Sequence, residues 1–185
     1  MLAIQGDFEA HAWALRRLSA EPVEVRRPAR LEGLDGLVIP GGESTTISMG
    51  LAAYGLEEPI REFASQGRAV FGTCAGLIVL DRAHLGLIDI EARRNAFGRQ
   101  LHSFEADLPI HGLGDEPVRA VFIRAPWIED AGEGVDVLAD LEGHAVVARQ
   151  GSMLVAAFHP ELTDDLRLHA YFLALTAERE RVGDR

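Results

Sequence analysis

The feature that most constrains the fold of this chain is a five-residue turn, Gly72-Thr73-Cys74-Ala75-Gly76, that lies between two apolar runs. Residues 69–71 have the composition of a buried strand, and residues 77–80 continue as a helix. Glycines on both sides of a central residue let the strand and the helix approach closely, and they leave the central side chain exposed at the helix N-terminus. The turn therefore predicts a strand–turn–helix unit with the chain's single cysteine at its tip.

Cys74 has two interpretations at this position. A free cysteine is commonly a small buried hydrophobe with no chemical role. At a helix N-terminus, however, the helix dipole and the free N–H groups favour the thiolate, which is the reactive form of cysteine. The second interpretation needs a base and an orienting acid elsewhere in the chain.

The motif Phe158-His159-Pro160-Glu161 supplies both groups after the strand-like residues 153–157. We expect Pro160 to hold His159 in extended geometry, so that His159 and Glu161 point to the same side. Glu161 can then orient one ring nitrogen while the other nitrogen faces a thiol. A histidine at a strand end can also be purely structural, but the two motifs together predict a catalytic triad of Cys74, His159 and Glu161.

Length and composition are typical of one domain, residues 1–185, since 48% of the residues are hydrophobic and 25% are charged. The 18 basic and 29 acidic residues give a net charge of −11, which opposes binding to nucleic acid or to a membrane surface. All 18 basic residues are arginine, so the chain has no lysine to form a Schiff base. No signal-peptide pattern, no apolar run of about 20 residues and no second cysteine are found, and we expect a cytoplasmic location.

Alternating strand and helix patterns predict an α/β fold. Apolar runs at residues 2–5, 23–25, 34–39 and 69–71 predict strands, and helical spacing is found from His11 to Leu18 and at residues 45–53 and 59–65. This order predicts three layers: a mostly parallel central sheet with helices on both faces and ligands at the carboxyl ends of its strands.

The C-terminal half has a different pattern of short strands joined by turns. The expected strands lie at residues 85–92, 103–107, 118–123, 135–138, 145–149 and 153–158, and an amphipathic helix at about residues 164–181 closes the chain. We expect this half to add antiparallel strands to the sheet.

Pro40-Gly41-Gly42-Glu43-Ser44 forms a glycine loop at another expected strand end. It could cradle a phosphate, although it lacks the Gly-Lys-Ser/Thr ending of such loops, or it could be a plain tight turn. A third interpretation fits the cysteine turn better: the N–H groups of Gly42 and Ala75 would together form an oxyanion hole for acyl transfer.

Several motifs along nearly the whole chain closely resemble one family, the glutaminase subunits of pyridoxal 5′-phosphate synthase, which are class I (triad) glutamine amidotransferases. The turn and His-Pro-Glu alone fit many triad amidotransferases. Three further blocks distinguish this subfamily: Gly41-Gly42-Glu43-Ser44-Thr45-Thr46, Arg94-Asn95-Ala96-Phe97-Gly98-Arg99-Gln100 and Phe122-Ile123-Arg124-Ala125-Pro126.

The resemblance implies hydrolysis of L-glutamine to L-glutamate and ammonia, with the ammonia passed to a separate (β/α)₈ synthase subunit in a hetero-oligomer. Cys74 would be the nucleophile, His159 the general base and Glu161 its orienting acid. The positions that match glutamine contacts are Gly42, Glu43, Ser44, Arg94, Ile123 and Arg124. Asn95, Arg99 and Gln100 would shape the site or the partner face. No cofactor and no metal are expected.

Two alternatives remain. A triad amidotransferase of another biosynthetic pathway would share Cys74, His159 and Glu161 and differ in its partner. A regulatory module could hold a small amide or carboxylate with the triad idle.

Overall fold

The computed structural model of the chain describes residues 1–97 and 103–183, with side chains up to residue 177. Arg99 and Gln100, expected near the site, lie outside the described residues. The described helices are α1 (Phe8–Arg17), α2 (Ser44–Ala53), α3 (Glu57–Ser65), α4 (Ala75–Leu80) and α5 (Arg167–Gly183), with 3₁₀ turns η1 (Pro28–Leu31) and η2 (Pro160–Leu162). The strands are β1 (Gly36–Ile39), β2 (Ala69–Thr73), β3 (Ile90–Arg93), β4 (Ser103–Leu108), β5 (Val118–Ile123), β6 (Trp127–Ala131), β7 (Asp136–Leu141), β8 (His144–Gln150) and β9 (Met153–Ala156).

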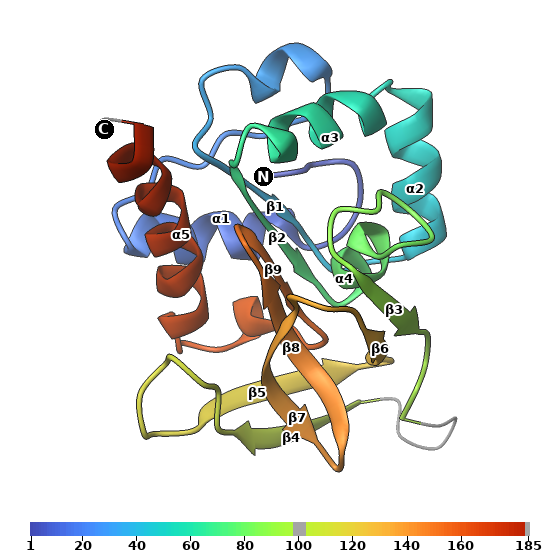
Figure 1. Cartoon of the computed structure of the whole chain (residues 1–185), viewed down its shortest axis with the longest axis vertical. Helices are drawn as coiled ribbons and strands as arrows, with labels where there is room; N and C mark the ends of the chain where they lie inside the picture. The colour runs from blue at the N-terminus through green and yellow to red at the C-terminus, as the bar shows by residue number, and fades with distance from the viewer. Residues whose placement is uncertain (98–102, 184–185) are drawn as a thin grey trace.

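A sheet runs through the middle of the molecule (Figure 1). Within the described residues its order is β1-β2-β9-β8-β6-β3, with β7 paired to β8 at the side. The pairs β1–β2 and β2–β9 are parallel, whereas β8, β6, β3 and β7 join in antiparallel pairs. Strands β4 and β5 form a separate antiparallel pair. The predicted α/β class, with parallel central strands and antiparallel additions in the C-terminal half, is confirmed.

Helices cover both faces of the parallel strands, as successive residues of β2 demonstrate. Phe71 contacts Phe172 of α5 and His11 of α1, with ring centroids 5.7 and 6.3 Å apart. Next to it, Gly72 faces α4, since a Cβ atom there would lie 2.7 Å from the carbonyl oxygen of Gly76. Because successive residues of a strand point to opposite faces, α1 and α5 lie on one face and α4 on the other.

The predicted N-terminal strands, residues 2–5 and 23–25, are wrong as strands. Only Leu2 and Val25 pair, in a single parallel bridge. The backbone N–H of Leu2 also donates to the Val38 carbonyl oxygen at 2.8 Å, so Leu2 extends the sheet beside β1. The chain reverses direction at Gly6, with φ of 102°, before a longer ladder can form.

Two other expectations in the second half need correction. Residues 85–89 are not part of a strand, because their backbone N–H groups bind the end of α4: Leu85 N–H donates to Val79 and Leu87 N–H donates to Leu80. Strand β6 was not predicted, because Glu129 and Asp130 give it a polar, exposed sequence. The other expected strands and the closing helix are found with bounds shifted by a few residues.

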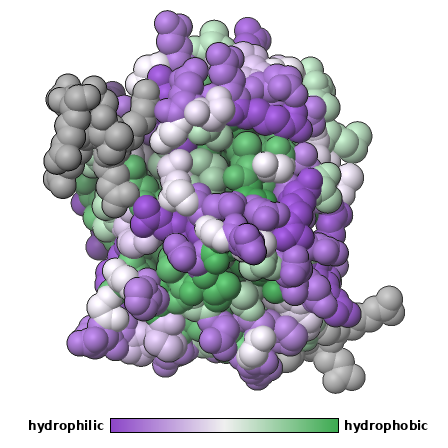
Figure 2. Space-filling view, in the orientation of Figure 1, coloured by the Kyte–Doolittle hydropathy of each residue, from purple (hydrophilic) through white to green (hydrophobic). Residues whose placement is uncertain are grey.

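Hydrophilic side chains cover much of the face seen in Figure 2, with hydrophobic residues visible between them. No helix among the residues with described structure is long and apolar enough to span a bilayer.

Candidate active site

The cysteine turn connects the central strand β2 to α4, as predicted. Cys74 adopts φ 47° and ψ −105°, a conformation that is rare for a residue with a side chain. The surrounding structure holds it there, since its backbone N–H donates to the Ala156 carbonyl oxygen of β9 at 2.8 Å. Gly76 is required at the start of α4, because a Cβ atom there would lie 2.1 Å from the carbonyl oxygen of Ile39.

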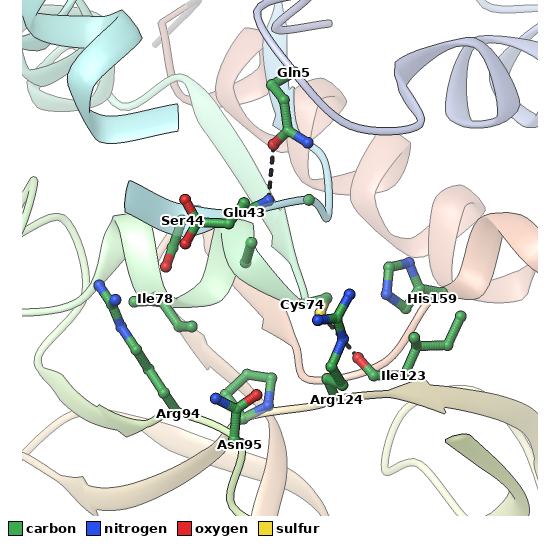
Figure 3. A pocket seen from close by; sticks show the side chains of 13 residues that line it. Gln5, Glu43, Ser44, Cys74, Ile78, Arg94, Asn95, Ile123, Arg124 and His159 are labelled. Atoms are coloured by element: carbon green, nitrogen blue, oxygen red, sulfur yellow. Dashed lines mark hydrogen bonds between the residues drawn. The ribbon is translucent and has the colours of Figure 1, made fainter. Parts of the chain in front are cut away.

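The Cys74 side chain is less exposed than the turn alone predicts, with only 7% of the residue accessible. It is nevertheless not sealed in the core. Cys74 lines a pocket of about 420 Å³, and its Sγ lies 3.8 Å from the Ile123 carbonyl oxygen at the end of β5 (Figure 3).

His159 and Glu161 follow β9 and meet as predicted, but by a different backbone route. The expected extended geometry through Pro160 is wrong, because Pro160 begins the 3₁₀ turn η2. Proline suits the first position of a helical turn, where its missing N–H is not needed. His159 Nδ1 lies 2.7 Å from Glu161 Oε1, and the Glu161 side chain is fully buried.

The pKa of His159 is strongly perturbed. Burial lowers it, but hydrogen bonding to Cys74 and Glu161, together with their negative charge, outweighs burial and raises the pKa to about 10. His159 therefore holds its proton at neutral pH. The resulting imidazolium stabilises negative charge on a neighbouring sulfur.

The pocket brings together nearly all the residues predicted for the site. Its walls include Gly42, Glu43, Ser44, Cys74, Ala75, Arg94, Ile123, Arg124 and His159. Glu161 does not line it, since it lies buried behind His159. The pocket also contains Gln5 and Ile78 (Figure 3) and Pro126, to which the motifs assigned no role. Ile78 and Pro126 lie within four residues of Cys74 and Arg124, whereas Gln5 reaches the pocket only through the tertiary fold.

Glu43 has a structural task that the sequence did not indicate. Its carboxylate caps α2, accepting hydrogen bonds from the N–H groups of Thr45 at 3.2 Å and Thr46 at 2.8 Å. These bonds lower the pKa of Glu43. Its own backbone N–H donates to Gln5 Oε1 at 2.7 Å, so the glycine loop is tied to the N-terminal segment (Figure 3).

Two guanidinium groups face the pocket. Arg94 Nη1 lies 3.3 Å from Thr45 Oγ1, and its Nη2 lies 3.3 Å from His84 Nε2. The other nitrogen of His84, Nδ1, lies 2.6 Å from Asp81 Oδ1. Arg124 follows β5 with φ of 43°. In a chain with a net charge of −11, these cations make the pocket suitable for a carboxylate.

Comparisons with known proteins agree with this arrangement. The model of the SNO glutamine amidotransferase family matches residues 1–178. Pyridoxal 5′-phosphate synthase subunit PdxT of Niallia circulans is 55% identical, over 96% of this chain and 97% of that protein. The protein of the same name from Geobacillus kaustophilus is 54% identical, over 96% and 94% of the two chains.

Solved structures give the same result. One described as a glutamine amidotransferase superposes with a TM-score of 0.91 and 49% identity, over 95% of this chain and 97% of the other. PurLQS from Thermotoga maritima, at 16% identity and a TM-score of 0.72 over 94% of this chain and 95% of that one, shares the fold.

The α/β fold, the cysteine turn at the carboxyl end of β2 and these comparisons together define a glutamine amidotransferase. The chain belongs to the SNO glutamine amidotransferase family. The resemblance inferred from its motifs is confirmed.

Proposed function

We propose that this chain is the glutaminase subunit of a pyridoxal 5′-phosphate synthase. It hydrolyses L-glutamine to L-glutamate and ammonia and supplies the ammonia to a synthase subunit that makes the vitamin B6 cofactor. The family match and the names of the relatives support this assignment. The observation that carries the chemistry is that Cys74 and His159 line one pocket while Glu161 binds the far side of the His159 ring.

In the proposed reaction the Cys74 sulfur, as thiolate, attacks the side-chain amide carbon of glutamine. The protonated His159 gives its proton to the leaving nitrogen, the C–N bond breaks, and ammonia departs from a thioester. Neutral His159 then takes a proton from water, which attacks the thioester carbon and releases glutamate and Cys74. Glu161 keeps the ring oriented and stabilises its charge throughout.

The negative charge on the amide oxygen needs donors that are already in position. The N–H of Ala75, the first residue of α4, and the N–H of Gly42 are the proposed oxyanion hole. Thr73 and Gln5 hold the loop that carries Gly42: Gly41 N–H donates to Thr73 Oγ1 at 3.1 Å, and Glu43 N–H donates to Gln5 Oε1. Loops of this kind stabilise charge only when correctly oriented, which gives a docked partner the means to activate the site.

We assign the substrate's own charged groups to the polar walls of the pocket. Arg94 and Arg124 suit the α-carboxylate of glutamine, and the loop residues Gly42, Glu43, Ser44 and Ile123 complete the contacts. Replacing Arg94 with alanine is expected to raise KM for glutamine at least about tenfold, because it removes a charge-assisted hydrogen bond. Arg93→Ala is the matched control, since Arg93 pairs with Glu129 instead. An equal rise in KM for both variants would contradict the assignment.

The proposal also covers the assembly. Residues 1–185 form one glutamine amidotransferase domain that docks on a (β/α)₈ synthase subunit in a hetero-oligomer in the cytoplasm. No metal or cofactor takes part on this chain.

The test is glutamine hydrolysis by the purified chain, alone and with the synthase subunit. We expect weak activity alone, strong activation by the synthase, and loss of turnover in Cys74→Ser. Covalent capture of Cys74 by a glutamine-like electrophile, absent in Cys74→Ser, excludes an idle triad. Activation by a synthase of another pathway, and not by this one, would overturn the assignment.

A further inference from the structure

Two histidines that the proposed reaction does not use lie behind the site. His11 comes from α1 and His169 from α5, and both are fully buried. Their rings pack edge-on against Phe71 of β2, with centroids 6.3 and 6.1 Å from the Phe71 ring. Neither histidine lines the pocket, so any effect on the reaction must pass through another residue.

The contacts of His11 lead directly to the triad. Its Nδ1 lies 2.9 Å from His169 Nε2, and its Nε2 lies 3.0 Å from Thr73 Oγ1. The same Nε2 lies 3.2 Å from Glu161 Oε2, the carboxylate oxygen that His159 does not use. Thr73 Oγ1 in turn accepts the N–H of Gly41.

The protons of this network can be assigned from burial and unmet hydrogen-bonding capacity. Burial lowers the pKa of His11 far below its ordinary value and that of His169 to about 4, so both rings are neutral and each carries one N–H. Glu161 Oε2 is buried and makes no aligned hydrogen bond within the part of the chain described. His11 Nε2 lies 3.2 Å from this oxygen, close enough to donate a hydrogen bond to it after a small rotation.

With its proton on Nε2, His11 donates toward Glu161 and Thr73, and its Nδ1 accepts from His169 Nε2–H. Of the two atoms of this network that lack a hydrogen bond, Glu161 Oε2 then gains a donor, and His169 Nδ1 keeps an unpaired lone pair but no unpaired N–H. The opposite tautomer would leave a buried carboxylate oxygen without a donor and give His169 an unpaired N–H, which costs more. Glu161 and His169 together favour the Nε2–H tautomer of His11.

We propose that His11 is a positioning residue for the triad: its Nε2–H holds the second oxygen of Glu161 and, through Thr73, the Gly41 end of the glycine loop. The orienting acid and the oxyanion loop are thereby fixed relative to each other. Without this donor, the Glu161 carboxylate is free to rotate about its bond to His159. This inference rests on the proposed function, since it assigns His11 to the same reaction.

The test compares two amides at position 11 in the complex with the synthase. In His11→Gln the side-chain NH₂ falls near the former Nε2, whereas in His11→Asn it falls near the former Nδ1. We expect His11→Asn to lower kcat about tenfold, the value of a hydrogen bond to a charged group, with KM changed less than twofold. His11→Gln should retain most of kcat. The thermal midpoints of both variants are measured alongside, and His111→Asn, an exposed histidine, is the control.

A double-mutant cycle with Glu161→Gln separates positioning from general loosening of the fold. If His11 acts through Glu161, His11→Asn lowers kcat less than twofold further in the Glu161→Gln background. An unchanged kcat in His11→Asn, equal losses in the Asn and Gln variants, or an undiminished loss in the Glu161→Gln background would each overturn the inference. If His11→Asn fails to fold, kcat of Thr73→Val is compared with that of Thr73→Ser. Only the valine removes the hydroxyl that contacts His11 Nε2 and Gly41 N–H, so a loss of kcat in Thr73→Val and not in Thr73→Ser is expected, and equal kcat values would overturn the inference. Failure of the proposed function is a different result: wild-type chain with synthase would then hydrolyse no glutamine.

Discussion

At the scale of single residues, charge and backbone conformation define the site. Cys74 lies in a rare backbone conformation, and His159 lies between it and the buried Glu161. The motifs predicted all three residues, because a nucleophile between glycines and a His-Pro-Glu segment are local patterns. They did not predict His11, since a lone histidine in a helical pattern has no local signature of its distant partners Thr73 and Glu161.

The raised pKa of His159 predicts a pH dependence of stability. Its pKa is about 10 in the folded chain and about 6.5 in an unfolded one. The folded state therefore binds the proton more tightly, so the stabilisation is complete below pH 6.5 and is lost as the pH rises to about 10. The difference in unfolding free energy between wild type and His159→Asn should accordingly shrink from pH 7 to pH 10, measured by urea denaturation. A difference that stays constant over this range would contradict the prediction. The lowered pKa values of His11 and His169 affect stability in acid, below this range. Both histidines are present in the wild type and in His159→Asn.

At the scale of elements, the close packing of α4 against β1 and β2 depends on glycines. Gly76 meets the backbone of Ile39 in β1, and a backbone carbonyl oxygen cannot move aside as a side chain can. The local pattern predicted this unit because glycine spacing and apolar runs are read along the chain. The same patterns missed β6, whose sequence is polar and exposed, and wrongly extended a strand over residues 85–89, whose backbone N–H groups bind the end of α4 instead.

Replacing Gly76 with alanine is expected to lower the free energy of unfolding by about 2 kcal/mol, as overpacking against a rigid neighbour does. Gly50→Ala in α2 is the matched control, because its Cβ would lie 2.5 Å from a side-chain methyl of Ile4, which can shift, and not from backbone, and alanine favours the helix by about 1 kcal/mol. Thermal and urea unfolding measure the stability of both variants. Equal stability of the two variants would show that the contact of Gly76 with Ile39 is not tight.

At the scale of the whole molecule, the two halves of the chain share one sheet. Strand β9, from the end of the chain, pairs with β2 and completes the parallel core. The closing helix α5 then packs on β2 beside α1. The site consequently draws residues from both halves, and the two halves share one hydrophobic core.

We therefore expect a single cooperative unfolding transition. The two tryptophans report on opposite halves, Trp13 on α1 and Trp127 on β6. Variants Trp13→Phe and Trp127→Phe each leave one reporter, and their fluorescence midpoints in urea, compared with those from circular dichroism of the same variant, should coincide. Within either variant, separate fluorescence and circular dichroism midpoints would indicate two independently folding units.

The sequence by itself determined the α/β class, the cysteine turn and the residues around the pocket, because each depends on neighbours a few positions away. The tertiary structure alone decided the charge state of His159, the hydrogen bond from Glu43 N–H to Gln5 and the link from His11 to Glu161. Those properties arise from burial and from hydrogen bonds between segments up to 158 residues apart, and no local pattern of residues encodes how distant segments pack.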